Sequence, residues 1–138
     1  MKLLLDTHVF LWALKNPDRL PHYVRRSITS GHDHILVSVA SLWEIAIKAS
    51  NGRLPFKDSS ELLGLEAWVH RMGAEILPVS ASHALETWHL REWKHKDPFD
   101  RLLATQTMSE AATLVTGDVT LQKCPGLRWL WNSAEGGL

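Results

Sequence analysis

The chain has 138 residues, a length that fits one domain with a core that needs no disulfides or structural metals. Its 15 basic and 15 acidic side chains cancel, so no global field favours a polyanion or a membrane, and any nucleic-acid site must be local. The single cysteine, Cys124, excludes an internal disulfide and a thiolate zinc cluster. No apolar stretch approaches the ~20 residues of a membrane span or forms a signal-peptide core, so we expect a soluble cytoplasmic protein.

Short apolar runs, such as residues 34–38, are typical of strands buried on both faces of a parallel sheet. The expected strands are residues 3–5, 34–38, 74–79, 113–116 and 127–131. Helical spacing and breakers predict helices between them, at residues 9–14, 21–31, 41–50, 60–72, 82–90 and from 98 to 111 or 112. This alternation predicts an α/β fold, with a parallel sheet flanked by helices on both faces.

Four acids lie next to the predicted ends of strands or starts of helices. Asp6 follows the first strand, Glu44 lies in the first turn after the second, and Asp118 follows the fourth. These three are expected at the carboxyl edge of the sheet, where open α/β sheets bind ligands. Asp100 lies in the first turn of the helix that begins at Pro98. Because that helix leads into the fourth strand, we expect its N-terminal end at the opposite edge.

Each acid also has a purely structural interpretation. The S-x-x-E pattern of residues 41–44 predicts a capping box, and Glu44 precedes Lys48 by four residues on one helix face. The first turn of the Pro98 helix also suits the acid Asp100. N-cap roles suit the other acids at helix starts, namely Asp6, Asp97 and Asp118.

A cluster of carboxylates has chemical consequences that a single acid lacks. Two carboxylates about 4 Å apart repel by about 4 kcal/mol at an effective dielectric of ~20, so several in one cleft share protons or bind a cation. Hard oxygen ligands favour Mg²⁺ or Mn²⁺, which suits attack of water on a phosphodiester. Histidines offer no comparable site, because His83, His89 and His95 lie six residues apart rather than on one helix face.

Four segments, in order and spacing, resemble the PIN-domain ribonucleases and, among them, the VapC-type toxins of bacterial toxin–antitoxin pairs. These segments are residues 3–8, 37–45, 97–104 and 114–118. The resemblance implies an α/β/α sandwich around a five-stranded parallel sheet, formed by residues 1–132 as one domain, with a frayed tail at 133–138. It also implies an endoribonuclease that uses Mg²⁺ or Mn²⁺, a homodimer, and a cognate antitoxin that covers the acidic pocket. Residues 9–14 and 60–72 are then the first place to look for the antitoxin groove.

The resemblance assigns roles to individual residues. The four acids of the family fall on Asp6, Glu44, Asp100 and Asp118. It brings the start of the Asp100 helix to the shared pocket, against our expectation from strand order. As a hypothesis, Asp6, Asp100 and Asp118 hold the metal, and Glu44 helps to place the metal or the attacking water. Supporting roles are expected for Thr7, Thr116 and Asp97.

Substrate contacts are expected from a basic, aromatic segment at residues 89–96. Lys94 and Lys96 suit phosphate contacts, and Trp93 suits stacking on a base of single-stranded RNA. The alternative is a solvated loop with Trp93 in the core. Arg101 either contacts phosphate or neutralises the acids, and His8 either touches substrate or lies on the surface.

Three other functional classes also involve an acid after the first strand or a PIN domain. A phosphatase with an aspartyl nucleophile needs D-x-D after the first strand, but His8 occupies the second acidic position. A receiver domain needs paired acids after the first strand and a lysine after the last, and the chain has neither. A PIN nuclease of RNA processing, rather than a toxin, stays open at this stage.

Overall fold

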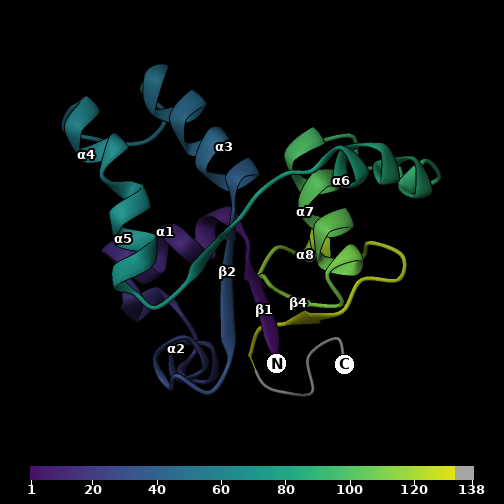
Figure 1. Ribbon diagram of the computed structural model, residues 1–138, viewed down its shortest axis with the longest axis horizontal. Coiled ribbons are helices and arrows are strands. Elements are labelled where there is room, and N and C mark those ends of the chain that lie inside the picture. Colours follow the sequence, from purple (N-terminus) through teal and green to yellow (C-terminus); the bar gives the residue numbers. More distant parts are fainter. Residues whose placement is uncertain (133–138) are drawn as a thin grey trace.

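Five parallel strands form one sheet in the order β3-β2-β1-β4-β5 (Figure 1). The computed structural model describes residues 1–132, and the tail predicted at 133–138 lies outside the described residues. The strands are β1 (Lys2–Leu5), β2 (His34–Ser38), β3 (Glu75–Leu77), β4 (Thr113–Val115) and β5 (Trp129–Leu130). All five overlap the predicted strands, which confirms the parallel α/β fold.

Helices cover both faces of this sheet (Figure 1). They are α1 (Thr7–Lys15), α2 (His22–Thr29), α3 (Val39–Ser50), α4 (Ser59–Leu63), α5 (Leu65–Arg71), α6 (Ala81–Glu86), α7 (Pro98–Ser109) and α8 (Val119–Gln122). Two 3₁₀ helices, η1 (Pro17–Arg19) and η2 (Thr87–Leu90), complete the described chain. No helix within residues 1–132 is long and apolar enough to cross a membrane.

The central strand explains why the apolar runs are continuous. Leu3 and Leu5 belong to a core cluster with buried residues of α1, α2, α3 and α5, whereas Leu4 belongs to a second cluster with residues of α7 and α8. Side chains alternate between the faces of a strand, so a strand covered on both faces is apolar at every position. All three leucines are fully buried.

Three predicted helices differ from those observed. The helix predicted at residues 82–90 is α6 as far as Glu86 and continues as the 3₁₀ helix η2. The helix predicted at residues 60–72 divides at Gly64 into α4 and α5. Within these helices Leu63 is 78% and Trp68 49% exposed, while Val69 is buried. The capping box predicted at residues 41–44 is also wrong. Ser38 is the N-cap of α3, its hydroxyl accepts the N–H of Ala40, and Ser41 lies inside the helix.

The ends of the three central strands are level with one another. Leu5 is in register with Val37 on β2 and with Val115 on β4. The residues that follow, Asp6, Ser38 and Thr116, therefore line up across the carboxyl edge of the sheet. Of these, Thr116 bonds Asp6 beside the pocket, whereas the Ser38 hydroxyl bonds Gln106 and the N–H of Ala40.

Helix α7 corrects our expectation for Asp100. Its C-terminal end leads into β4, and in a parallel sheet such a helix runs antiparallel to the strand that it precedes. The helix therefore begins at the carboxyl edge, and Asp100 in its first turn lines the same pocket as Asp6 and Asp118. Our expectation that this helix begins at the opposite edge of the sheet was wrong.

Candidate active site

The four acids Asp6, Glu44, Asp100 and Asp118 line one pocket at the carboxyl edge of β1, β2 and β4. The pocket has a volume of about 190 Å³. Its remaining lining residues are Thr7, His8, Lys48, Asp97 and Leu121. Four carboxylates separated by up to 112 positions in the sequence thus meet in one hollow (118 − 6 = 112).

Asp6 is the buried acid at the base of this pocket, with only 5% of its surface exposed. It is the N-cap of α1, and its Oδ1 accepts the Val9 N–H at 2.8 Å. Its Oδ2 accepts the Thr116 hydroxyl at 2.5 Å. Burial raises the pKa of Asp6 from its ordinary 3.8 to about 6, although both hydrogen bonds act in the opposite direction. The charge of Asp118 raises this pKa further.

Thr116 connects Asp6 to the turn that carries Asp118. Its hydroxyl oxygen accepts the Asp118 N–H at 3.0 Å, so its proton is free to point at Asp6. Asp118 is exposed, and its carboxylate is the N-cap of the short helix α8, accepting the Thr120 N–H at 2.8 Å. The predicted cap roles of Asp6 and Asp118 are both confirmed, and each acid also faces the pocket.

Glu44 is held by donors on both carboxylate oxygens. The Thr7 hydroxyl donates to its Oε1 at 2.6 Å, and Lys48 Nζ donates to its Oε2 at 2.8 Å. The Ser41 hydroxyl lies 3.0 Å from the Thr7 oxygen and donates to it, because the single Thr7 proton is committed to Glu44. This arrangement confirms the predicted Glu44–Lys48 pair and fixes the direction of a buried carboxylate.

We expect Thr7→Val to lower the free energy of unfolding by about 1–3 kcal/mol, because it leaves buried polar groups on Glu44 and Ser41 without their partner. Urea unfolding measures this loss. Thr7→Ser restores the hydroxyl and should recover most of the stability. If the valine and serine variants were equally stable, the Thr7–Glu44 hydrogen bond would not contribute to the fold.

Asp100 has a partner that the sequence did not reveal. His95 Nε2 lies 2.7 Å from Asp100 Oδ2, and the His95 ring packs against the Trp93 ring with centroids 5.0 Å apart. Burial raises the pKa of Asp100, and the nearby charge of Asp97 acts in the same direction, while the His95 hydrogen bond lowers it. Asp97 caps α7 through the N–H groups of Phe99 and Asp100, as predicted, and also lines the pocket. No spacing rule links a loop histidine to this helix.

The loop before α7, at residues 91–97, places its aromatic residue in the core rather than in contact with RNA. Trp93 is only 9% exposed and packs in the core, so it offers no face for a base. Arg101 is turned away from the pocket, since its guanidinium donates to the backbone carbonyls of Leu90, Trp93 and His95. The structure thus shows Arg101 holding the loop, and its contact with phosphate stays a prediction. Lys94 and Lys96 are exposed, and their contact with RNA stays a prediction.

Comparison with known proteins decides the family of this chain. The sequence profile of the PIN domain matches residues 3–127. The chain belongs to the PIN-domain family. No protein with a curated function matches the sequence.

Solved structures share this PIN fold over nearly their whole chains. VapBC2 of Rickettsia felis, bound to a DNA fragment from its promoter, has a chain that aligns at 23% identity with a TM-score of 0.74, covering 95% of this chain and 99% of that one. A chain of DNA-bound VapBC of Salmonella typhimurium aligns at 22% identity with a TM-score of 0.72, covering 94% of this chain and 97% of that one. VapBC-1 of nontypeable Haemophilus influenzae aligns at 19% identity and 0.68, with the same coverage. At these identities, the similarity to the three structures is a similarity of fold.

The chemistry of the PIN-domain pocket suits a divalent cation. Within residues 1–132, no three Asp, Glu, His or Cys side chains surround one point closely enough to form a ready-made metal cage. Mg²⁺ needs no such cage, because it keeps several waters and takes one or two carboxylates. Burial raises the pKa of Asp6 and of Asp100, and a cation bound beside them would stabilise their charged forms. The hard oxygen donors therefore fit Mg²⁺ or Mn²⁺.

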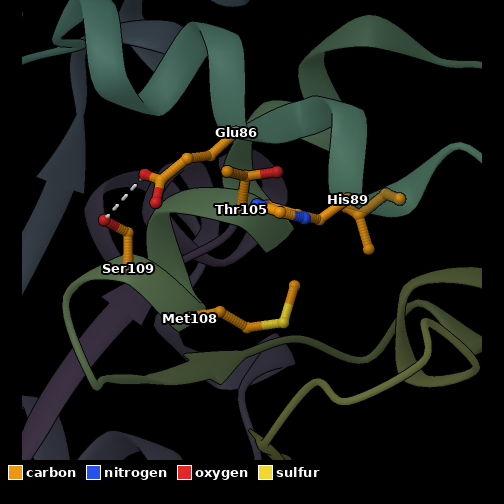
Figure 2. A pocket seen from close by; sticks show the side chains of 6 residues that line it. Glu86, His89, Thr105, Met108 and Ser109 are labelled. Atoms are coloured by element: carbon orange, nitrogen blue, oxygen red, sulfur yellow. Dashed lines mark hydrogen bonds between the residues drawn. The ribbon is translucent and has the colours of Figure 1, made fainter.

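Another hollow of about 290 Å³ lies on the side of the PIN domain formed by α6, η2 and α7 (Figure 2). Thr105, Met108 and His89 line it, and Ser109 Oγ donates to Glu86 Oε2 across 3.4 Å. It contains a single carboxylate and is mostly apolar. The pocket at the carboxyl edge instead brings together Asp6, Glu44, Asp97, Asp100 and Asp118, which makes that pocket the candidate active site.

Proposed function

We propose that this PIN-domain protein is a metal-dependent endoribonuclease and acts as the cytoplasmic toxin of a toxin–antitoxin pair. The observation that carries the proposal is the meeting of Asp6, Glu44, Asp100 and Asp118 in one pocket with Asp6 buried. Membership of the PIN-domain family supports a phosphodiester as the bond that is cut. The fold shared with chains of VapBC complexes supports the role in such a pair.

Asp6, Asp100 and Asp118 are the residues that would hold Mg²⁺ or Mn²⁺. Such a cation, when bound, supplies positive charge that stabilises hydroxide and offsets the negative charge of the phosphate. Thr116 orients one oxygen of Asp6, and His95 orients one oxygen of Asp100. These hydrogen bonds limit the directions in which the two carboxylates present their remaining lone pairs.

Glu44 is suited to positioning the attacking water. Thr7 and Lys48 each occupy one site on its carboxylate, which has about four lone-pair sites, so others stay available to accept from a water. Lys48 also lines the pocket and brings a positive charge toward the phosphate. Attack by water rather than by the ribose 2′-hydroxyl leaves a 3′-hydroxyl and a 5′-phosphate.

An antitoxin is expected to cover part of this surface. Leu14, Phe56, Leu65 and Trp68 line a mainly apolar hollow of about 250 Å³ between α1 and α5. Leu14, Leu65 and Trp68 belong to the two segments, residues 9–14 and 60–72, that were named as the first place to look for the groove, whereas Phe56 lies outside them. The half-exposed Trp68 suits the apolar face of a partner helix. The homodimer stays a prediction.

Cleavage of single-stranded RNA tests the proposed activity directly. We expect cleavage with Mg²⁺ or Mn²⁺, loss of cleavage with EDTA, and recovery when excess Mg²⁺ is added back. Products should carry 3′-hydroxyl and 5′-phosphate ends, and a 2′,3′-cyclic phosphate would contradict attack by water. In cells, expression should arrest growth and Asp100→Ala should relieve the arrest. RNA cleavage in vitro without growth arrest would favour a nuclease of RNA processing over a toxin.

A further inference from the structure

A second hollow adjoins the acidic pocket on the side of β4 and β5. This aromatic hollow has a volume of about 290 Å³ and is lined by Asp6, His8, Trp12, Gly117, Asp118 and Trp131. Asp6, His8 and Asp118 line both this hollow and the acidic pocket, so the two are continuous. A group seated in the second hollow therefore lies next to the carboxylates.

Aromatic rings form the walls of this hollow. The Trp12 and Trp131 rings lie with centroids 6.2 Å apart and planes at 48°, and the His8 ring lies 5.9 Å from Trp12. Both tryptophans are half-buried, so each is anchored on one side and open on another. Two large tilted rings beside a polar pocket suit a flat, apolar-faced ligand.

Gly117 makes room for this arrangement. A Cβ at position 117 would lie 2.6 Å from Trp131, so the Trp131 ring packs directly on the backbone of the turn that carries Asp118. Trp131 follows β5, which pairs with β4. The sheet thereby brings a tryptophan near the C-terminal end of the described chain to the side of α1.

Positive charge lies beyond the aromatic walls. The Arg19 guanidinium lies over the Trp12 ring, 4.5 Å from its centroid. Arg19 lines a further hollow of about 250 Å³ that shares His8 and Trp12 with the aromatic hollow. Lys15 also lines it, but its Nζ is paired with Glu61 Oε1 at 2.8 Å. Carboxylates, aromatic rings and cations thus follow one another along a continuous surface.

We infer that the aromatic hollow binds the base of an unpaired nucleotide next to the scissile bond, and that Arg19 receives a phosphate further along the strand. This inference rests on the proposed ribonuclease function and adds a substrate subsite to it. Aromatic rings with neighbouring cations are the means by which proteins bind single-stranded nucleic acid, because every base has a face that stacks. A base in a duplex cannot reach the rings, so the subsite selects unpaired RNA.

The test combines two variants with a modified substrate. The substrates are a single-stranded oligoribonucleotide whose cleavage site has been mapped with the parent protein, and copies with an abasic nucleotide on either side of that site. We expect Trp12→Leu and Trp131→Leu each to lower kcat/KM on intact RNA by about 5- to 150-fold. For the parent, the abasic nucleotide should lower kcat/KM by a similar factor. On abasic RNA, the two variants should have nearly the same kcat/KM as the parent.

Trp88→Leu is the matched control. Trp88 is 61% exposed and carries the Arg91 guanidinium 3.6 Å from its ring centroid, as Trp12 carries Arg19, but it lies on η2, outside the lining of the acidic pocket. Its kcat/KM should equal that of the parent. Trp12→Phe should keep most of the activity on intact RNA, because it keeps a ring.

Equal losses on intact and abasic RNA would show that the tryptophans only support the fold, and would overturn the inference. Unchanged kcat/KM in both variants would show that the surface does not bind the substrate, and would also overturn the inference. Affinity is also measured with Asp6→Asn protein and a fluorescent oligonucleotide. If the parent cleaves no RNA, the proposed function fails, while a loss of affinity specific to the intact base would still support the subsite.

Discussion

Asp6→Asn protein is expected to lose RNA cleavage by about a thousandfold, and its stability should no longer depend on pH as that of the parent does. The loss of activity follows because asparagine cannot supply the negative charge that holds a cation, an effect of several kcal/mol on the barrier. Asparagine has the same shape as aspartate and can still cap α1 by accepting the Val9 N–H. Loss of activity is therefore expected without loss of fold.

The direction of the pH effect follows from the raised pKa. The pKa of Asp6 is about 6 in the folded protein against an ordinary 3.8, so between these values the folded state binds more protons than the unfolded state. The free energy of unfolding should then be highest, as far as Asp6 contributes, below pH 3.8 and should fall as the pH rises through 6. The full change is up to roughly 3 kcal/mol, at about 1.4 kcal/mol for each unit of pKa.

Urea unfolding in EDTA at several pH values from 4 to 7.5 measures this difference between the parent and Asp6→Asn. Asp18→Asn is the control, since the Asp18 side chain is 98% exposed and its removal should leave the pH dependence of the parent unchanged. Mg²⁺ should stabilise the parent at pH 7.5 more than it stabilises Asp6→Asn, because a ligand of the folded state raises its stability. Identical pH profiles for parent and Asp6→Asn would contradict the raised pKa.

Arg101→Lys should lower the free energy of unfolding by about 2–4 kcal/mol, although it keeps the positive charge. The Arg101 guanidinium donates to three backbone carbonyls, with Nε at 2.8 Å from His95 O and Nη1 at 2.9 Å from Leu90 O, and Nη2 bonding Trp93 O. A lysine ammonium cannot reproduce this planar fork, and each part-buried carbonyl left without a donor costs about 1–3 kcal/mol. The loop that the arginine holds also carries His95, the partner of Asp100.

Cleavage should fall together with stability in Arg101→Lys, because a looser loop no longer holds His95 against Asp100. Urea unfolding gives the stability, and limited proteolysis should reveal faster cutting within residues 90–97. Arg91→Lys is the control, since Arg91 is exposed and stays close to the same loop. A lysine variant with normal stability but weaker RNA binding would instead support the prediction that Arg101 contacts phosphate.

Much of the fold could be predicted from the sequence, because it depends on interactions between neighbouring residues. The three-leucine run of β1 and the polar residues that follow it predict a buried strand running into a helix, because burial on both faces and N-capping are properties of neighbouring residues. The N-cap roles of Asp6, Asp97 and Asp118 are local in the same sense and were predicted correctly. The four-residue α8 was missed because one turn has too few apolar positions to show a period.

The surroundings of the acids depend on contacts between distant segments. Helix direction relative to β4 decides that Asp100 meets Asp6, and the level ends of β1 and β4 decide that Thr116 donates to Asp6 across 110 positions. Neither contact could be predicted from the spacing of residues in the sequence.

The sequence by itself determined the PIN-type order of strands, helices and acids, because secondary structure and capping arise between near neighbours. Only the tertiary structure decided what each side chain touches. It placed Arg101 on the loop carbonyls, Trp93 in the core, and Trp131 beside Trp12. Burial and long-range hydrogen bonds depend on what the whole sheet brings together, and they set the pKa of Asp6 and the walls of the pocket.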